Sequence, residues 1–255
     1  MNVEVPEGSS GAIVVTGASR GIGRAIAERL ARGGRRVIGT YHTGHDEAAD
    51  LAATHGVEVL QVDLSDRSKT EEFAATLASE HHISGLVNNA GIIEFEVFTE
   101  FTMASWDRTM EVNVNAPLIL SKALADAMSP GSAIVNIAST DAEIGSYSSI
   151  AYSASKATLL SLTKSLACVL GDRGIRVIAV TPGWVDTGMS TEESYEAAGL
   201  TPLRRNGLPG EVASLVEFLL SDAASFISGS SLVIDGGYTC VDYIMKKEND
   251  ALAQE

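Results

Sequence analysis

The stretch Thr16-Gly17-Ala18-Ser19-Arg20-Gly21-Ile22-Gly23 follows directly on the apolar run at 12–15 and leads into a segment of helical period at 21–33. Its glycines let the chain turn sharply and approach a ligand closely. The free N–H groups and positive dipole end of the following helix suit a pyrophosphate. The spacing differs from the common G-x-G-x-x-G, because three residues separate the first two glycines. The stretch predicts a dinucleotide site or, as the simpler alternative, a plain strand-to-helix turn.

The rest of the chain alternates short apolar runs with longer segments of helical period. Strands are expected at 12–15, 36–40, 58–62, 85–88, 133–138, 176–181 and 231–234. Helices are expected at 21–33, 45–55, 67–81, 103–129, 151–171 and 210–222. The strand runs are rich in Val and Ile and mostly lack polar alternation, which is typical of strands covered on both faces. The alternation therefore predicts the α/β class, with a doubly wound parallel sheet.

The 255 residues contain no internal repeat and no linker that would divide them, so one domain is expected. We expect this domain to span 11–238. A flexible N-terminus would precede it at 1–10. A polar C-terminal tail at 239–255 would follow, either frayed or used in assembly.

Composition and charge exclude several function classes. The formal net charge of −15 argues against nucleic acid and anionic membrane surfaces as partners, because phosphate binding needs clustered Lys and Arg. Residues 1–10 lack the features of a secretory signal, and no window approaches the ~18 apolar residues of a membrane span. Cys168 and Cys240 show no metal-ligand spacing, so no metal site is expected. Two isolated thiols suit a reducing cytoplasm.

Further short motifs follow the glycine turn in order: Asn88-Asn89-Ala90-Gly91, Asn113, Ser139, Tyr152-x3-Lys156 and Pro182-Gly183. Together with that turn they resemble the ordered motif set of short-chain dehydrogenases/reductases, over about 11–238. The resemblance, which extends to the 3-oxoacyl-carrier-protein reductase-like branch, implies a Rossmann-type sheet of seven parallel strands in the order 3-2-1-4-5-6-7. It implies an oxidoreductase that moves a hydride between NAD(P) and a carbonyl or secondary alcohol. It also implies a homotetramer or homodimer assembled through the helices at 103–129 and 151–171.

Tyr152 and Lys156 are four residues apart in a segment of helical character, so they share one helix face. Ser139 stands thirteen residues upstream, at the carboxyl end of an expected strand. Lowering the tyrosine pKa from ~10 to near neutrality requires about 4 kcal/mol. An ammonium ~4 Å away, at an effective dielectric near 20, supplies an interaction of that size, which desolvation of the tyrosinate would oppose. We therefore expect Lys156 to lower the pKa of Tyr152, together with the charge of the oxidised nicotinamide.

The resemblance also implies roles for the neighbours of this pair. Lys156 would hold the nicotinamide ribose, and Ser139 would orient the substrate oxygen. Asn113 would lie at a local helix distortion, where its backbone carbonyl holds a water in a proton relay. Pro117, four residues later, cannot donate a hydrogen bond to that carbonyl, which gives a physical reason for the distortion. The alternative is that Pro117 only kinks a long helix.

The cofactor would lie along the carboxyl ends of the strands. Asp63-Leu64 would hold the adenine, although Asp63 could instead cap the next helix, a role that Ser65 or Asp66 would share. The cofactor-binding residues expected from the resemblance are Thr16, Gly17, Ser19, Arg20, Gly21, Ile22, Gly23, Tyr41, His42, Asp63, Leu64, Asn89, Ala90, Gly91, Tyr152, Lys156, Pro182, Gly183, Val185 and Thr187.

The end of the second expected strand favours NADP(H), with NAD(H) still possible. An NAD-selective site usually carries an acidic residue there for the ribose 2′-OH. Here the chain reads Gly39-Thr40-Tyr41-His42-Thr43, with no acid before Asp46. Arg20 would meet a 2′-phosphate, unless it only faces solvent.

The least regular stretch, 188–208, follows a strand and is expected to form a substrate loop. The substrate would be a small carbonyl or alcohol compound. One alternative is a 3-oxoacyl-(acyl-carrier-protein) reductase, although residues 128–132 offer no basic patch for an acidic carrier. Another class is a nicotinamide-binding regulator without turnover, and the retention of Ser139, Tyr152 and Lys156 argues against it.

Overall fold

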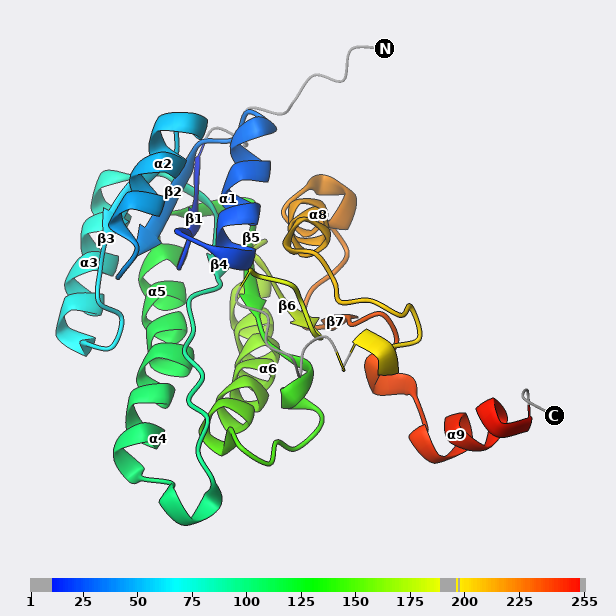
Figure 1. Cartoon of the computed structure of the whole chain (residues 1–255). Helices are drawn as coiled ribbons and strands as arrows, with labels where there is room; N and C mark the ends of the chain where they lie inside the picture. Colours follow the sequence, from blue (N-terminus) through cyan, green and yellow to red (C-terminus); the bar gives the residue numbers. More distant parts are fainter. Residues whose placement is uncertain (1–10, 189–195, 197, 253–255) are drawn as a thin grey trace, which may run out of the picture.

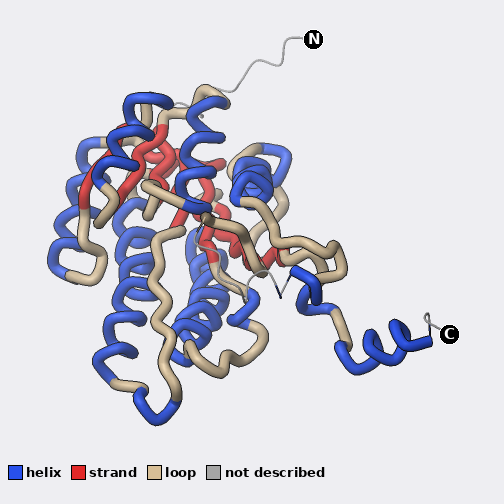
Figure 2. The backbone as a smooth tube through the Cα atoms, viewed as in Figure 1, coloured by secondary structure: helices blue, strands red, loops and turns tan. Residues whose placement is uncertain are grey.

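The computed structural model describes residues 11–188, 196 and 198–252. Seven parallel strands form one sheet in the order β3-β2-β1-β4-β5-β6-β7, which confirms the predicted Rossmann-type topology (Figures 1 and 2). The strands are β1 Ala12–Val15, β2 Val37–Tyr41, β3 Glu58–Gln61, β4 Ile83–Asn88, β5 Met128–Ile137, β6 Arg176–Pro182 and β7 Ser231–Ile234. The strand order reverses between β1 and β4, so a crevice opens beside their carboxyl ends.

Alternate residues of the central strands enter two different cores. Ile13 and Val15 of β1 pack into the core on one face, whereas Ala12 and Val14 pack into the core on the other. All four are fully buried, as expected for a strand with helices on both sides.

Helices on both faces cover the sheet (Figure 1). The first core is closed by α1 Gly21–Arg32, α2 His45–His55 and α8 Pro209–Leu219. The second is closed by α3 Arg67–Glu80, α5 Ala116–Ala125 and α6 Ile150–Gly171. The helices expected from sequence period are therefore present on both faces, with small shifts at their ends.

The helix predicted at 103–129 is wrong at its end, and inside it the helical pattern changes locally. It consists of α4 Met103–Met110, a π-helical segment Glu111–Asn115 and α5. Ala127 N–H closes the last turn on the Leu124 carbonyl, and Met128 already pairs with Ile83 of β4. Pro130 also disfavours the helical conformation for the residue before it. The apolar Met128 extended the helical pattern because it is buried, but it is buried in the sheet.

The C-terminal tail is helical in its described part. A short turn at Tyr238–Cys240 leads to α9 Tyr243–Leu252, which extends away from the sheet (Figure 1). The carboxylate of Asp242 accepts hydrogen bonds from the N–H groups of Ile244 and Met245, so it caps this helix.

Besides residues 253–255 of the predicted C-terminal tail, two predicted regions fall at least partly outside the described residues. The N-terminus at 1–10 lies wholly outside them, and the expected substrate loop at 188–208 includes 189–195 and 197. Within the described ranges, no helix combines the length and apolar character needed to cross a membrane.

Candidate active site

The glycine turn brings the backbone of α1 against the ends of β1 and β4. Gly17 adopts a φ of 67°, in the left-handed region that favours glycine. A Cβ at Gly23 would lie 2.2 Å from the Gly17 carbonyl oxygen and 2.3 Å from Nδ2 of Asn89. These positions therefore require glycine for conformation and for close approach, respectively.

Gly23→Ala is expected to destabilise the protein, because the added methyl group meets backbone and a hydrogen-bonded amide. Overpacking of this kind typically costs about 1–3 kcal/mol. Urea denaturation measures the change in the free energy of unfolding. Gly171→Ala is the matched control, since a Cβ there meets no atom within 4 Å. An unchanged stability for Gly23→Ala would contradict the observed close packing.

Thr16 and Asn89 join the end of β1 to the end of β4. The Thr16 hydroxyl accepts hydrogen bonds from Asn89 N–H (3.0 Å) and Ala90 N–H (2.9 Å) and donates to the Val87 carbonyl at 3.3 Å. The Asn89 amide donates to the carbonyls of Thr16 (2.9 Å) and Gly17 (3.2 Å). Thr16, predicted as a cofactor contact, is buried and positions Asn89 and Ala90 instead.

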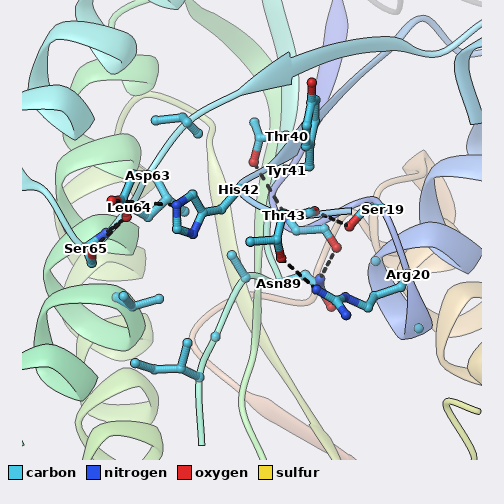
Figure 3. A pocket seen from close by; sticks show the side chains of 18 of the residues that line it. Ser19, Arg20, Thr40, Tyr41, His42, Thr43, Asp63, Leu64, Ser65 and Asn89 are labelled. Carbon is cyan, nitrogen blue, oxygen red and sulfur yellow. Dashed lines mark hydrogen bonds and ion pairs between the residues drawn. The ribbon is translucent and has the colours of Figure 1, made fainter. Parts of the chain in front are cut away.

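A cleft of about 480 Å³ lies over this junction (Figure 3). The predicted cofactor residues that line it are Gly17, Ser19, Arg20, Gly21, Ile22, Gly23, Tyr41, His42, Asp63, Leu64, Asn89, Ala90, Gly91 and Thr187. The N-terminus of α1 opens on the cleft with no side-chain cap and no acidic residue in its first turn. Its amides are thus left for an anion, so the cleft fits the diphosphate of a dinucleotide.

One end of the cleft carries a cationic side chain that sequence reasoning assigned to a 2′-phosphate. Arg20 Nη2 donates to the Thr43 hydroxyl at 2.8 Å, and the Ser19 hydroxyl donates to the Thr43 carbonyl at 3.4 Å (Figure 3). Arg20 is exposed, yet it forms part of the cleft wall. The sequence offered two alternatives for Arg20, contact with a 2′-phosphate or exposure to solvent only. The side chain is exposed and also lies at the cleft, where a 2′-phosphate could reach it.

Asp63 lies in the cleft and does not cap α3. Its Oδ1 accepts hydrogen bonds from the N–H (3.0 Å) and hydroxyl (2.6 Å) of Ser65, and the hydroxyl bond is the main cause that lowers the pKa of Asp63. The cap is Asp66, which accepts from Lys69 N–H. His42 lies 3.7 Å from Asp63 across the cleft wall (Figure 3).

Ser139, Tyr152 and Lys156 line a second cavity of about 200 Å³. Pro182 and Gly183, at the end of β6, line it as well. This cavity shares Ile22, Asn89, Gly91 and Ile92 with the larger cleft, so the two adjoin. The fold thus brings together the three side chains that the sequence predicted as catalytic, beside the predicted cofactor site.

Lys156 is buried, with 3% of its surface exposed. Its Nζ donates to the Ile137 carbonyl at 2.8 Å and lies 5.5 Å from the centroid of the Tyr152 ring. Burial lowers the pKa of Lys156 to about 8, because the charged form loses its hydration.

The expected lowering of the Tyr152 pKa is wrong for the chain without cofactor. The pKa of Tyr152 is raised to about 12, mainly by burial and to a smaller extent by the negative charge of Asp141. A hydrogen bond with Ser139 acts in the opposite direction. Desolvation of the phenolate therefore outweighs the stabilisation that was expected from Lys156.

Asn113 lies within the π-helical segment, so the predicted local helix distortion is confirmed. Its side chain donates to the Ile92 carbonyl (2.9 Å) and to the Ser155 hydroxyl (3.0 Å) and accepts from Ile92 N–H (2.9 Å). Asn113 thereby joins the loop after β4 to α6. A Cβ at Gly91 would lie 3.2 Å from Asn113 Oδ1 and 3.4 Å from Lys156 Nζ, so both side chains pack close to this glycine.

Val185, a predicted cofactor contact, lines neither the main cleft nor the cavity that holds Tyr152. It pairs with Gly207 in an isolated bridge and lines a separate small cavity beside α8. The sequence did not assign to the cofactor the other lining residues of the main cleft, namely Thr40, Thr43, Val62, Ser65, Ile92, Arg108 and Val112, although Ile92 belongs to the stretch 89–96 expected at the substrate pocket. Thr43 could have been found from its place at the end of β2. Arg108 of α4 carried no such signal.

Comparisons with known proteins agree with this arrangement. The family model described as enoyl-(acyl carrier protein) reductase matches residues 17–239. Cis-4-hydroxycyclohexanecarboxylate dehydrogenase of Sinomonas cyclohexanicum is 39% identical, over 89% of this chain and 96% of its own. The 3-oxoacyl-(acyl-carrier-protein) reductase of Aquifex aeolicus is 36% identical, over 88% and 95%. A short chain dehydrogenase from Burkholderia cenocepacia, solved in complex with NADP, superposes with a TM-score of 0.84 at 34% identity, over 89% and 97%.

Proposed function

Because the chain belongs to the short-chain dehydrogenase/reductase family and is thus an oxidoreductase of alcohols and carbonyl compounds, we propose that it uses NADP(H) and that Tyr152 exchanges the proton with the substrate oxygen. One observation carries the proposal: Ser139, Tyr152 and Lys156 line a single cavity that adjoins the dinucleotide cleft. The test is a panel of ketones and alcohols assayed with both cofactors at the reduced-nicotinamide absorbance band.

In the direction of reduction, the Tyr152 hydroxyl donates its proton to the carbonyl oxygen. With a pKa of about 12 the phenol is protonated near neutral pH, as a proton donor must be. The Ser139 hydroxyl holds the same oxygen and orients it. The nicotinamide, when bound, supplies the hydride to the carbonyl carbon.

In the direction of oxidation, Tyr152 must take a proton from the alcohol as a phenolate. The Lys156 ammonium stabilises that phenolate, and Lys156 also holds the nicotinamide ribose. Since burial lowers the pKa of Lys156 to about 8, its charge is largely present at pH 7. The positive charge of the oxidised nicotinamide acts in the same direction, which offsets part of the desolvation of Tyr152.

Asn113 completes the set as the residue that holds a water by its backbone carbonyl, in a relay toward Lys156. The π-helical segment supports this role, because the backbone hydrogen bonds around Asn113 depart there from the regular α-helical pattern. The hydrogen bonds of the Asn113 side chain to Ile92 and Ser155 keep its backbone in place.

Preference for NADP(H) rests on Arg20 and on Thr43, to which it is hydrogen-bonded. Arg20→Gln is expected to lower kcat/KM for NADPH by roughly 10- to 100-fold, because hydrogen bonds to a charged group contribute about 1.5–3 kcal/mol. The value for NADH should change by less than about threefold, since NADH carries no 2′-phosphate. Steady-state kinetics with both cofactors measures the ratio.

The control is Arg29→Gln, which lies on α1, the helix that Arg20 precedes, and is paired with Glu217 away from the cleft. It should leave the ratio of NADPH to NADH unchanged. An equal loss with both cofactors in Arg20→Gln would refute the 2′-phosphate role.

Reduction of 3-oxoacyl groups on a carrier protein is the second candidate, favoured by the resemblance to the Aquifex aeolicus enzyme. Against it, Arg173, a basic residue near 128–132 that could contact an acidic carrier, is already bound to Asp126 (3.2 Å) and to the Ala125 carbonyl (2.6 Å). A saturable reaction with the carrier-bound thioester, far faster than with its short analogue, would establish this candidate.

A further inference from the structure

Ser153 follows Tyr152 in α6, and its hydroxyl forms a hydrogen bond outside the helix. It donates to the Asp141 carbonyl at 2.6 Å. Other hydroxyls of α6 donate to carbonyls of the same helix, as is common for Ser and Thr in helices, namely those of Ser155, Thr158, Thr163 and Ser165. Because Asp141 follows Ser139 closely in the chain, Ser153 joins the helix of one reacting group to the turn that carries the other.

The hydroxyl of Ser139 is oriented by the backbone of this turn. Ser139 is the N-cap of the short helix Thr140–Ala142, and its hydroxyl oxygen accepts a hydrogen bond from Asp141 N–H at 3.2 Å. This bond uses the oxygen as an acceptor and leaves the O–H free to donate. Ser139 also lines the catalytic cavity. A shift of the Asp141 backbone would therefore displace or rotate the Ser139 hydroxyl at the reacting groups.

Two hydrogen bonds from α6 hold the chain on either side of Ser139. Lys156 Nζ donates to the Ile137 carbonyl at 2.8 Å before it, and Ser153 donates to the Asp141 carbonyl after it. Within the described part of the chain, no other hydrogen bond joins the backbone of the short helix to α6. The helix that bears the proton donor therefore fixes the backbone of Ser139 from both sides.

We infer that Ser153 is a positioning residue, which keeps the hydroxyls of Ser139 and Tyr152 at the separation where both reach one substrate oxygen. The inference rests on the proposed function, in which these two groups share that oxygen. Ser153 is not among the described residues that line either cavity, so it acts through Ser139. A displacement of about 1 Å in a catalytic group can cost on the order of 10²-fold in rate, so this one hydrogen bond has a large effect.

Ser153→Ala is expected to lower kcat for ketone reduction by roughly 10- to 100-fold, because the Ser139 hydroxyl loses its fixed position. Alanine is a good helix former, so α6 should fold as before. The Kd for NADPH should stay within about twofold of the wild-type value, since the removed hydroxyl lies outside the dinucleotide cleft. Steady-state kinetics gives kcat, and quenching of protein fluorescence by NADPH gives the Kd.

Two further variants accompany this measurement. Ser153→Thr keeps a hydroxyl at the same position, so it should recover most of the lost rate. Ser165→Ala is the matched control, because it removes an exposed hydroxyl of the same helix that donates to the Ser161 carbonyl at 3.3 Å. It should keep the wild-type kcat.

A double-mutant cycle with Ser139→Ala shows whether Ser153 acts through Ser139. Once the Ser139 hydroxyl is absent, Ser153 has nothing left to position. Ser153→Ala should then lower kcat by less than about threefold in the Ser139→Ala background, although it costs much more in the wild-type background. The same loss in both backgrounds would assign Ser153 a role independent of Ser139, and would overturn the inference while the proposed function stands.

The pH profile of alcohol oxidation gives a second measurement. The hydrogen bond with Ser139 lowers the pKa of Tyr152. Its loss in Ser153→Ala should raise that pKa, and oxidation needs the phenolate, so the profile should move to higher pH. An unmoved profile or an unchanged kcat in Ser153→Ala would overturn the inference alone. No turnover of any alcohol or ketone by the wild-type protein with either cofactor would overturn the proposed function and the inference together.

Discussion

Tyr152→Phe is expected to lose nearly all turnover while it retains its affinity for NADPH. The variant removes only the phenolic oxygen, so the cavity keeps its shape and the dinucleotide cleft is untouched. General acid–base catalysis contributes on the order of 10²–10⁴-fold to a rate, and the loss in kcat should fall in that range. Steady-state kinetics gives kcat, and quenching of protein fluorescence by NADPH gives the Kd.

Tyr147→Phe is the matched control, because Tyr147 is fully exposed and should tolerate the loss of its hydroxyl. If Tyr152→Phe kept its turnover, the proton would have to come from another group. A loss of turnover accompanied by an equal loss of NADPH affinity would instead indicate that Tyr152 acts through cofactor binding.

Lys156→Met is expected to lower kcat/KM for alcohol oxidation by roughly 10²-fold or more, and to move the pH profile to higher pH. Met fills a similar volume without the ammonium, so the phenolate of Tyr152 loses the positive charge that lies 5.5 Å from its ring centroid. Removal of a positive charge raises the pKa of a neighbouring phenol, which gives the direction of the shift. The pH dependence of kcat/KM measures both effects.

Lys164→Met provides the control, because this exposed lysine lies two turns further along α6. It should keep the wild-type rate and profile. Lys156→Met with a lower rate but an unmoved pH profile would contradict the electrostatic role, and would leave Lys156 only as a ligand of the ribose.

The fold could be predicted because local patterns and topology agree. Val- and Ile-rich runs separated by helical segments specify a parallel sheet with helices on both faces, and the handedness of the crossovers restricts the strand order. The glycine turn correctly predicted the position of the crevice, since Gly23 packs against the Asn89 side chain there. The end of α5 was missed because Met128 is apolar in either element, so sequence period could not tell a buried strand from a buried helix.

The parts of the site that could not be predicted depend on contacts between residues far apart in the sequence. Arg108 of α4 lines the cleft and donates a hydrogen bond to Glu94 of the loop after β4, a contact that no local motif reveals. The pKa of Tyr152 depends on burial and on Asp141, and neither can be judged from the spacing of Tyr152 and Lys156. Thr16 was assigned to the cofactor from its motif, although its hydroxyl already accepts hydrogen bonds from the N–H groups of Asn89 and Ala90.

Hydride transfer itself tests the central proposal most directly. NADPH carrying deuterium at the transferable position is mixed with the protein and with the ketone that gives the fastest loss of reduced-nicotinamide absorbance. We predict many turnovers per chain, one alcohol formed for each NADPH consumed, and deuterium on the new carbinol carbon. NADPH that binds in the cleft but is consumed with none of the ketones would contradict the account, and would favour a nicotinamide-binding regulator on the same fold.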